Sequence, residues 1–307
     1  SPAPRPSPAG RIKPGVVIPG NGIMASGYGH QTSSERDKYY YSASGTSMSS
    51  PLTAGCCIII REYLRKARGV EVPNNSLVKA VLIAGARTLY PGQYTEFEEI
   101  ANVRPNHMEG HGQVNLRESL MPKEGKMEFF EQTFTATDQA VTNTFEKGAG
   151  LDLTVALCWT DPPTASGAAK ILINDLDLYV IDPNGTVYTR DDHLNNNEIL
   201  HLSNTPAGTY KVVVKANSIM QGEITGSVVM NQSRNQSNGL LALAVEPVCK
   251  LGADSVELVL TNLEDNCDVT VDCSVSQSSE RIYSFSESQV TFTKTKTVTL
   301  MADLARS

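Results

Sequence analysis

The period of the hydrophobic pattern changes near residue 122, and this change divides the chain into parts of different secondary structure. Before Met121-Pro122, apolar residues gather in two stretches of helical length. After it, they form short runs, often alternating with polar residues and separated by turn signals such as 182–185, a pattern typical of a β-sandwich. We therefore predict an α/β part at 1–122, a sandwich at 123–233 and a further small β-rich region at 234–307.

The strands predicted after residue 122 are all short. In the sandwich they are 128–134, 152–159, 171–181, 185–188, 198–202 and 209–214, and residues 231–238 form a polar break. In the last region they are 255–260, 268–275 and 291–300. Nothing in this last region indicates a function.

The part before residue 122 is predicted to contain helices that follow a buried strand, which is typical of an α/β layer. Residues 12–19 form the apolar strand, and 21–44 is predicted to be a surface loop. One helix is expected over 47–66, ending at Gly69, with a buried apolar front and an exposed charged end. A second is expected from the N-cap Ser76 to about Leu89.

Composition excludes some classes of protein. The net charge is −7, which argues against a nucleic-acid binder because such proteins carry basic surfaces. No apolar run reaches the length of a membrane span. The chain begins at Ser1 without a methionine or a signal peptide, so we expect a processed or partial sequence. We also expect it to be secreted or to lie in a secretory or vacuolar lumen.

The strongest chemical signal is Ser44-Gly45-Thr46-Ser47-Met48-Ser49-Ser50-Pro51. A serine hydroxyl becomes a nucleophile when a base takes its proton. At the amino end of a buried helix it is held in place beside unpaired N–H groups that stabilise developing negative charge. The alternative for these residues taken alone is an ordinary Ser/Thr cap on a core helix.

These residues resemble the nucleophile motif Gly-Thr-Ser-Met-Ala-x-Pro of the subtilase family of serine proteases, with Ser49 in place of Ala. Upstream, 10–20 resembles the family's Lys-Pro-Asp-x-x-Ala-Pro-Gly segment, with Gly15 and Ile18 in place of Asp and Ala. Downstream, 110–116 resembles the glycine-rich close of the protease domain. The resemblance implies a serine endopeptidase that acts on peptides or proteins, with Ser47 as the acyl-forming nucleophile.

The resemblance also implies residues that this chain does not contain. The Ser-His-Asp triad of subtilisin has the chain order Asp, His, Ser, and no such Asp or His motif precedes Ser47. The oxyanion Asn is missing as well. We therefore expect the N-terminal part of a protease domain as a partner, and expect this chain alone to be inactive. Two alternatives remain open: a non-catalytic binding protein acting through its β domains, and a hydrolase that uses the loop histidine His30.

Acidic residues are frequent among the predicted sandwich strands, although Asp and Asn are otherwise depleted from strands. Asp175 and Asp177 alternate onto one face, which favours a shared role. The region resembles the jelly-roll domain that follows the catalytic domain in large alkaline subtilases, which implies calcium. Oxygen ligands in such numbers suit Ca²⁺, whereas the alternative is that they cap turns. The candidate ligands are Asp161, Asp175, Asp177, Asp192 and Glu198.

Overall fold

The computed structural model describes residues 10–26, 40–90, 92, 100, 103–122, 124–165, 167–168 and 170–234, and the backbone of the strands between 243 and 303. The chain divides into two compact units, Ser1–Gln236 and Ser237–Ser307. It is mostly β-sheet with few helices, in agreement with the β-rich pattern of the sequence. His30 lies outside the described residues.

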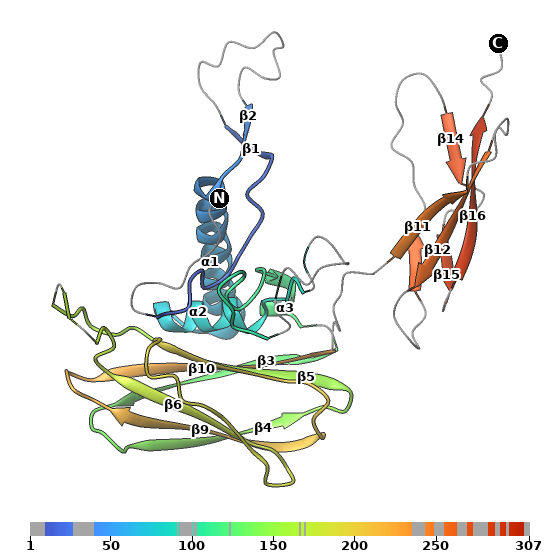
Figure 1. The fold of residues 1–307 in the computed structure, drawn as a ribbon. Coiled ribbons are helices and arrows are strands. Elements are labelled where there is room, and N and C mark those ends of the chain that lie inside the picture. Colours follow the sequence, from blue (N-terminus) through green and yellow to red (C-terminus); the bar gives the residue numbers. More distant parts are fainter. Residues whose placement is uncertain are drawn as a thin grey trace. The chain divides into compact units, whose positions relative to one another are not determined.

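Two four-stranded antiparallel sheets form the larger part of the first unit (Figure 1). One sheet has the order β3-β10-β5-β8, formed by Lys126–Phe134, Ile224–Arg234, Leu151–Trp159 and Asn197–Leu202. The other has the order β4-β9-β6-β7, formed by Ala140–Lys147, Gly208–Ser218, Asp175–Ile181 and Val187–Arg190. The two sheets lie face to face, as the alternating strand pattern predicts for this part of the chain.

The pleat of β5 divides its side chains between two cores. The core between the sheets contains Leu153, Val155, Leu157 and Trp159. The alternate residues Ala156 and Cys158 face the helices. This division follows from the two-residue period of a strand. The buried Trp159 indole donates its N–H to the carbonyl of Asn174 at 3.0 Å. The first sheet is therefore covered on both faces.

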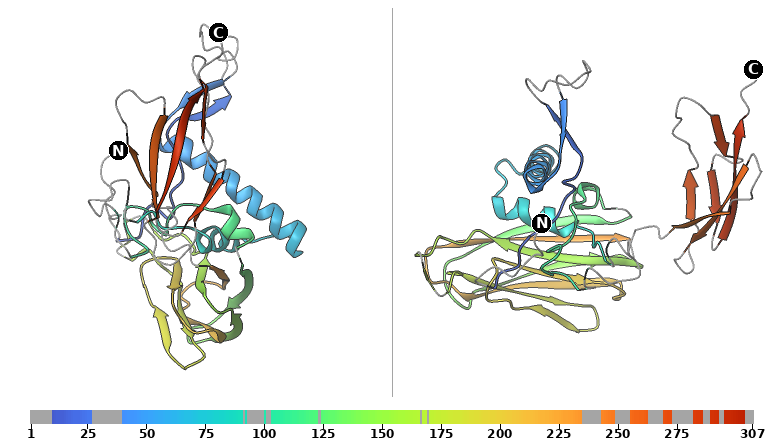
Figure 2. Two further views of the ribbon diagram at one scale, coloured as in Figure 1. Left: turned by 90° about the vertical axis from the view of Figure 1, so that its right-hand side faces the viewer. Right: turned by 45° about the horizontal axis from the view of Figure 1, so that its top comes forward.

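Three described helices belong to the first unit: α1 (Thr46–Arg68), α2 (Asn75–Ala84) and α3 (Leu116–Leu120). Figures 1 and 2 show α2 lying across the β3-β10-β5-β8 sheet, while α1 extends away from it. The buried residues Leu77 and Val81 of α2 belong to one cluster with Cys158 and Val229 of that sheet. This packing ties the helices to the sandwich.

The predicted helices exist, but their limits differ. α1 ends at Gly69, as predicted, in a left-handed conformation with φ 70°. Ser76 is not an N-cap: it lies inside α2, is buried, and its Oγ lies 2.8 Å from Ser227 Oγ of β10. α2 ends at Ala84, five residues earlier than about Leu89. The residue that follows the helix is Gly85, where an added Cβ would lie 2.2 Å from Ser119 N.

The strands before and within the sandwich also differ from expectation. Residues 12–19 do not form a sheet strand; Val17 makes one parallel bridge to Gln113. Part of the predicted loop is a hairpin of β1 (Ile23–Ser26) and β2 (Tyr40–Ala43). Within the described residues no larger parallel sheet occurs, so the α/β layer remains a prediction. The sequence pattern missed β4 and β10, and β10 runs into the predicted polar break.

The second unit contains six described strands and is described here by its backbone alone. A four-stranded sheet has the order β11-β12-β16-β14, and β13 pairs with β15. The strands are Leu243–Val248, Ser255–Asn262, Val269–Asp272, Ile282–Phe285, Gln289–Phe292 and Thr295–Asp303, numbered β11 to β16. Across the described residues of the whole chain, no helix combines the length and apolar character that crossing a membrane requires.

Candidate active site

Ser47 is the second residue of α1, and it is exposed to solvent. The chain enters the helix through Gly45, whose carbonyl accepts hydrogen bonds from the amides of Met48 at 3.0 Å and Ser49 at 3.4 Å. The first turn of a helix presents unpaired N–H groups and the positive end of the helix dipole. The predicted placement of Ser47 at the amino end of a helix is confirmed, and this residue is accessible.

The start of α1 is held by the segment that precedes β1. The Gly45 amide donates to the Gly20 carbonyl at 2.7 Å, and the Gly22 amide donates to Ser44 Oγ at 2.9 Å. Ser44 Oγ in turn donates to Asn21 Oδ1 at 2.7 Å. The two motifs singled out in the sequence, 10–20 and 44–51, therefore meet directly at the turn that leads to Ser47.

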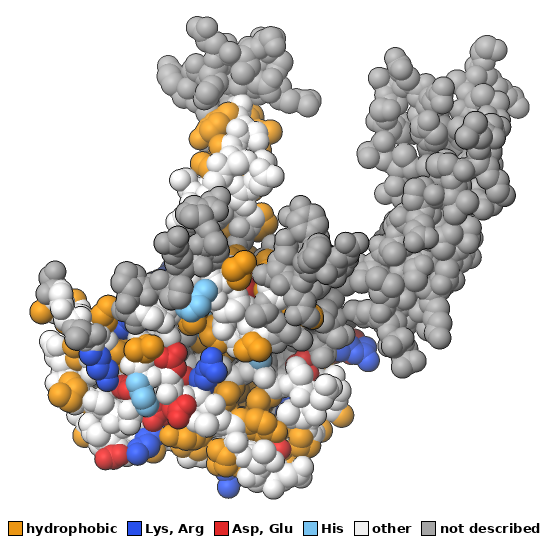
Figure 3. All heavy atoms as spheres, viewed as in Figure 1, with side chains coloured by type: hydrophobic (Ala, Val, Ile, Leu, Met, Phe, Trp, Pro, Cys, Tyr) orange, Lys and Arg blue, Asp and Glu red, His pale blue; other side chains and the backbone are white. Residues whose placement is uncertain are grey.

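The apolar front of α1 is not buried, which corrects the expectation from the sequence. Ile60 is fully buried against α2, but Ile58 is 66% exposed, and Leu52 and Ile59 are also exposed. Figure 3 shows further hydrophobic side chains on the narrow upper part of the described surface, where Figure 1 places β1 and β2. A helix that is apolar around most of its circumference is normally enclosed, whereas the described residues cover only one side of α1.

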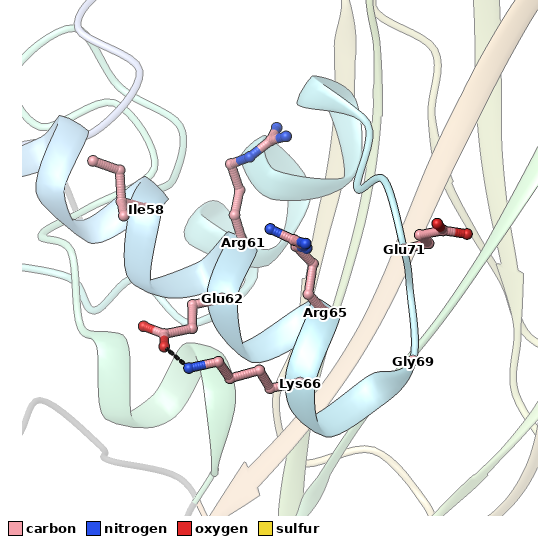
Figure 4. Close-up of a pocket in the computed structure, with 7 residues that line it drawn as sticks. All are labelled: Ile58, Arg61, Glu62, Arg65, Lys66, Gly69 and Glu71. Atoms are coloured by element: carbon pink, nitrogen blue, oxygen red, sulfur yellow. Dashed lines mark hydrogen bonds and ion pairs between the residues drawn. The ribbon is translucent and has the colours of Figure 1, made fainter.

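An open pocket of about 660 Å³ lies beside the carboxyl-terminal half of α1 (Figure 4). Arg61 and Arg65 project toward the connection to α2, and Arg61 donates to the Pro73 carbonyl at 3.1 Å. Lys66 pairs with Glu62 on the same helix. The lining residues are Ile58, Arg61, Glu62, Arg65, Lys66, Gly69 and Glu71. Ser47 is not among them, so this pocket is separate from the nucleophile.

Within the described residues, no histidine makes a hydrogen bond to Ser47. His111 Nε2 lies 3.3 Å from Asn197 Nδ2, and His201 Nδ1 lies 3.1 Å from Thr154 Oγ1. Burial lowers the pKa of His111 to about 3 and lowers the pKa of His201 as well. Both imidazoles are therefore neutral at physiological pH and belong to contacts with the sandwich. The base that a serine nucleophile needs is not provided by these two residues.

The third motif, 110–116, forms backbone hydrogen bonds to two other segments of the chain. The His111 amide donates to the Gly15 carbonyl at 2.9 Å, and the Gln113 amide donates to Arg87 O at 2.7 Å. A Cβ added at Gly110 would lie 2.1 Å from the Pro14 carbonyl oxygen. Glycine is required here because the chains approach too closely for a side chain. This motif joins the helical part to the segment that supports Ser47.

Two of the five candidate metal ligands accept hydrogen bonds from backbone amides. Asp161 accepts the amides of Ile173 and Asn174 at 2.7 and 2.8 Å. Asp192 accepts the amide of Leu194 at 2.8 Å and the side-chain amide of Asn195 at 2.6 Å. Asp192 therefore makes the contacts of a carboxylate that caps a turn, whereas Asp161 joins residues far apart along the chain. Both carboxylates bind backbone amides, as the alternative considered from the sequence describes, and calcium binding stays a prediction.

The other three candidates lie buried near β6. Asp175 and Asp177 are brought together, as their alternation predicted, and His193 from the β7–β8 loop joins them: their ligand atoms lie within 4.8 Å of one another. Glu198 is buried on β8, and burial raises its pKa to about 9, so it is protonated at neutral pH. Sequence reasoning missed His193, because nothing local connects a loop histidine to two aspartates on a distant strand.

Comparisons with known proteins concern the sequence of this part of the chain. Residues 3–112 match the family model of the subtilase family. This segment is therefore similar to the subtilase family. The match includes both motifs that meet at the turn leading to Ser47 and ends within the glycine-rich crossing at 110–116. The resemblance suggested by the sequence is confirmed for this part of the chain.

Three curated relatives from Dictyostelium discoideum extend the similarity beyond the subtilase segment. Serine protease/ABC transporter B family protein tagD is 29% identical over 228 residues, which is 56% of this chain and 12% of the relative. The proteins of the same description named tagB and tagA are 26% and 22% identical, over 75% and 74% of this chain. The chain spans only 12%, 16% and 15% of the lengths of these relatives.

Proposed function

We propose that this chain is the nucleophile-bearing part of a serine endopeptidase. The observation that carries the proposal is the placement of Ser47: exposed, at the second position of α1, and next to a turn that the Gly20 carbonyl holds through the Gly45 amide. The similarity of residues 3–112 to the subtilase family supports the same chemistry. The relatives' descriptions as serine proteases also agree with it.

In this proposal, Ser47 Oγ attacks the carbonyl carbon of a peptide bond while a base takes its proton. The carbonyl oxygen becomes negatively charged and is stabilised by N–H groups at the first turn of α1. The intermediate then collapses: the C–N bond breaks, the amine leaves with a proton from the protonated base, and an ester to Ser47 remains. Water, deprotonated by the same base, hydrolyses this ester and restores the Ser47 hydroxyl.

The base and its acidic partner would come from a further segment of protease domain that packs on α1. The exposed apolar side chains of Leu52, Ile58 and Ile59 support the proposal that such a segment covers α1, because an apolar surface of this kind is normally covered. The resemblance supplies the identity of the groups: a His, an Asp and an oxyanion Asn. Without that segment, we expect the chain to bind or cleave no peptide at Ser47.

The test is peptide hydrolysis by a longer protein that includes the sequence preceding Ser1, compared among three variants. Ser47→Ala should lower kcat/KM by about 10⁴-fold or more, the usual loss when a triad member is removed. The matched control is Ser50→Ala, which removes an exposed hydroxyl from the same turn and should keep activity within about twofold. Equal activity of wild type and Ser47→Ala would favour the alternative of a non-catalytic binding protein.

A further inference from the structure

Three side chains on the outer face of the β4-β9-β6-β7 sheet form a compact group that the proposed proteolysis does not use. Asp175 and Asp177 come from the beginning of β6, on the face opposite the core residues Leu176 and Leu178. His193 reaches them from the loop between β7 and β8. Its Nδ1 lies 2.9 Å from Asp175 Oδ2 and 3.8 Å from Asp177 Oδ1.

The two carboxylates are buried and only partly satisfied. Their side chains are 2% and 7% exposed, and the Oδ1 atom of each has no hydrogen-bond partner among the described residues. Buried carboxylate oxygens normally find a donor or a cation, because leaving them unpaired costs free energy. These two oxygens therefore indicate a missing positively charged group.

The surrounding charges do not supply that group. Lys215, which faces Asp177 across the β6–β9 register, forms its ion pair with Asp138 instead, at 2.8 Å. Asp191 adds further negative charge near Asp177. His193 is half-exposed and contributes at most one positive charge to two acids. A divalent cation would balance the group.

The remaining contacts orient the two aspartates. Asn217 Nδ2 donates to Asp175 Oδ2 at 3.1 Å, and the Tyr179 hydroxyl lies 3.5 Å from Asp177 Oδ2. Both contacts engage Oδ2 and leave Oδ1 available. Hydrogen bonds from neighbouring side chains commonly fix ligand carboxylates in this manner. The arrangement resembles a site whose ligands are already oriented.

The donor set does not fit calcium well. Ca²⁺ takes six to eight oxygen ligands, whereas this group offers an imidazole nitrogen, and the Asp161 and Asp192 carboxylates are engaged with backbone amides. Imidazole with carboxylates suits zinc and similar ions, which bind three protein ligands and water. We propose that Asp175, Asp177 and His193 bind a divalent transition-metal ion, of which Zn²⁺ is the representative.

The test uses calorimetric titration of the chelator-treated chain with ZnCl₂ and, separately, with CaCl₂. Wild type should bind zinc at this site more tightly than calcium. Asp177→Asn and His193→Gln should each weaken zinc binding by about tenfold or more. Glu128→Gln is the matched control, since it removes a partly exposed carboxylate from β3 of the other sheet, and its zinc affinity should equal that of wild type. The cysteines are the same in all variants, so differences in zinc binding report this site.

A second measurement protects the test against misfolding. Zinc should raise the Tm of wild type and Glu128→Gln, but not that of His193→Gln, whose side chain is half-exposed and is not part of the core. Equal zinc binding in wild type, Asp177→Asn and His193→Gln would overturn the proposal. Tighter binding of calcium than zinc, or binding of neither ion, would overturn it as well. None of these outcomes depends on whether Ser47 is a nucleophile.

Discussion

Gly20 lies so close to the start of α1 that a Cβ added to it would stand 2.2 Å from Ser49 Oγ and 2.8 Å from the Gly45 carbonyl oxygen. The serine side chain could rotate away, but the Gly45 backbone is fixed by its hydrogen bond to Gly20. The absence of a side chain at residue 20 therefore determines where the helix begins. Ser47 follows Gly45 by two residues, so its position depends on this contact.

Replacing Gly20 by Ala should displace the first turn of α1 while leaving the sandwich intact. In a longer protein with its remaining protease segment, we expect fluorophosphonate labelling of Ser47 to slow by about 100-fold, since misplacement by about 1 Å is that costly. Gly15→Ala is the control, because a Cβ at residue 15 meets no atom within 4 Å. Equal labelling rates in the two variants would show that the contact does not position Ser47.

Replacing Gly110 by Ala should destabilise the first unit strongly. Gly110 has φ 63°, and its Cβ would lie 2.1 Å from the Pro14 carbonyl oxygen. Gly150 has the similar φ of 69° but nothing within 4 Å, so Gly150→Ala measures backbone strain alone, about 1 kcal/mol. Urea unfolding should show a loss for Gly110→Ala at least about 2 kcal/mol larger. Similar losses of stability in the two variants would mean that the backbone around Gly110 moves easily to make room for a Cβ.

The two isoleucines Ile58 and Ile60 test whether a further segment covers α1. Ile60 is fully buried and Ile58 is 66% exposed. In this chain, Ile60→Ala should cost about 2–5 kcal/mol of unfolding free energy, and Ile58→Ala under about 0.5 kcal/mol. In a longer protein that contains the covering segment, the cost of Ile58→Ala should rise into the range expected for Ile60→Ala. An unchanged cost there would contradict the proposed cover.

The pH dependence of stability should contain a contribution from His111. Burial, with smaller effects of Lys79 and Arg104, lowers its pKa from 6.5 to about 3. Below about pH 6.5, His111 therefore binds a proton in the unfolded chain but not in the folded chain. The free energy of unfolding decreases as the pH falls from about 6.5 toward 3. His111→Gln should remove about 2 kcal/mol of the decrease between pH 7 and pH 5. The measurement is urea unfolding at both pH values.

A matched variant separates this effect from general acid sensitivity. Met108→Leu changes an exposed side chain without an ionisable group on the same segment and should keep the wild-type dependence between pH 7 and pH 5. If both variants retain the full decrease, the buried imidazole is not its source. If both lose it equally, the segment rather than His111 is responsible.

The sequence predicts some features of this structure because local rules decide them. Gly69 ends α1 because glycine adopts the left-handed conformation without strain, and most strands of the sandwich follow from alternation. The pattern missed β4 and β10 because their partners decide their strand character: Asn231 lies on β10 and donates to the Glu118 carbonyl at 2.7 Å. Burial along α1 could not be predicted, since it depends on what covers the helix.

In the candidate sites too, local features could be predicted from the sequence and long-range contacts could not. The place of Ser47 follows from a contiguous motif, whereas the contact between Gly20 and Gly45 joins residues that only the fold brings together. Among the acidic residues, the alternation of the strand correctly predicted that Asp175 and Asp177 lie together. The position of His193 beside them depends on loop conformation, as do the backbone contacts of Asp161 and Asp192. Long-range loop contacts of this kind have no local signal in the sequence.

The measurement that tests the proposed chemistry most directly is covalent labelling of Ser47 by a fluorophosphonate, located by mass spectrometry of peptides. We expect no labelling of this chain alone, and rapid labelling confined to Ser47 in a longer protein that includes the preceding protease segment. Absence of labelling at Ser47 in that folded longer protein, or labelling that persists after Ser47→Ala, would contradict the account.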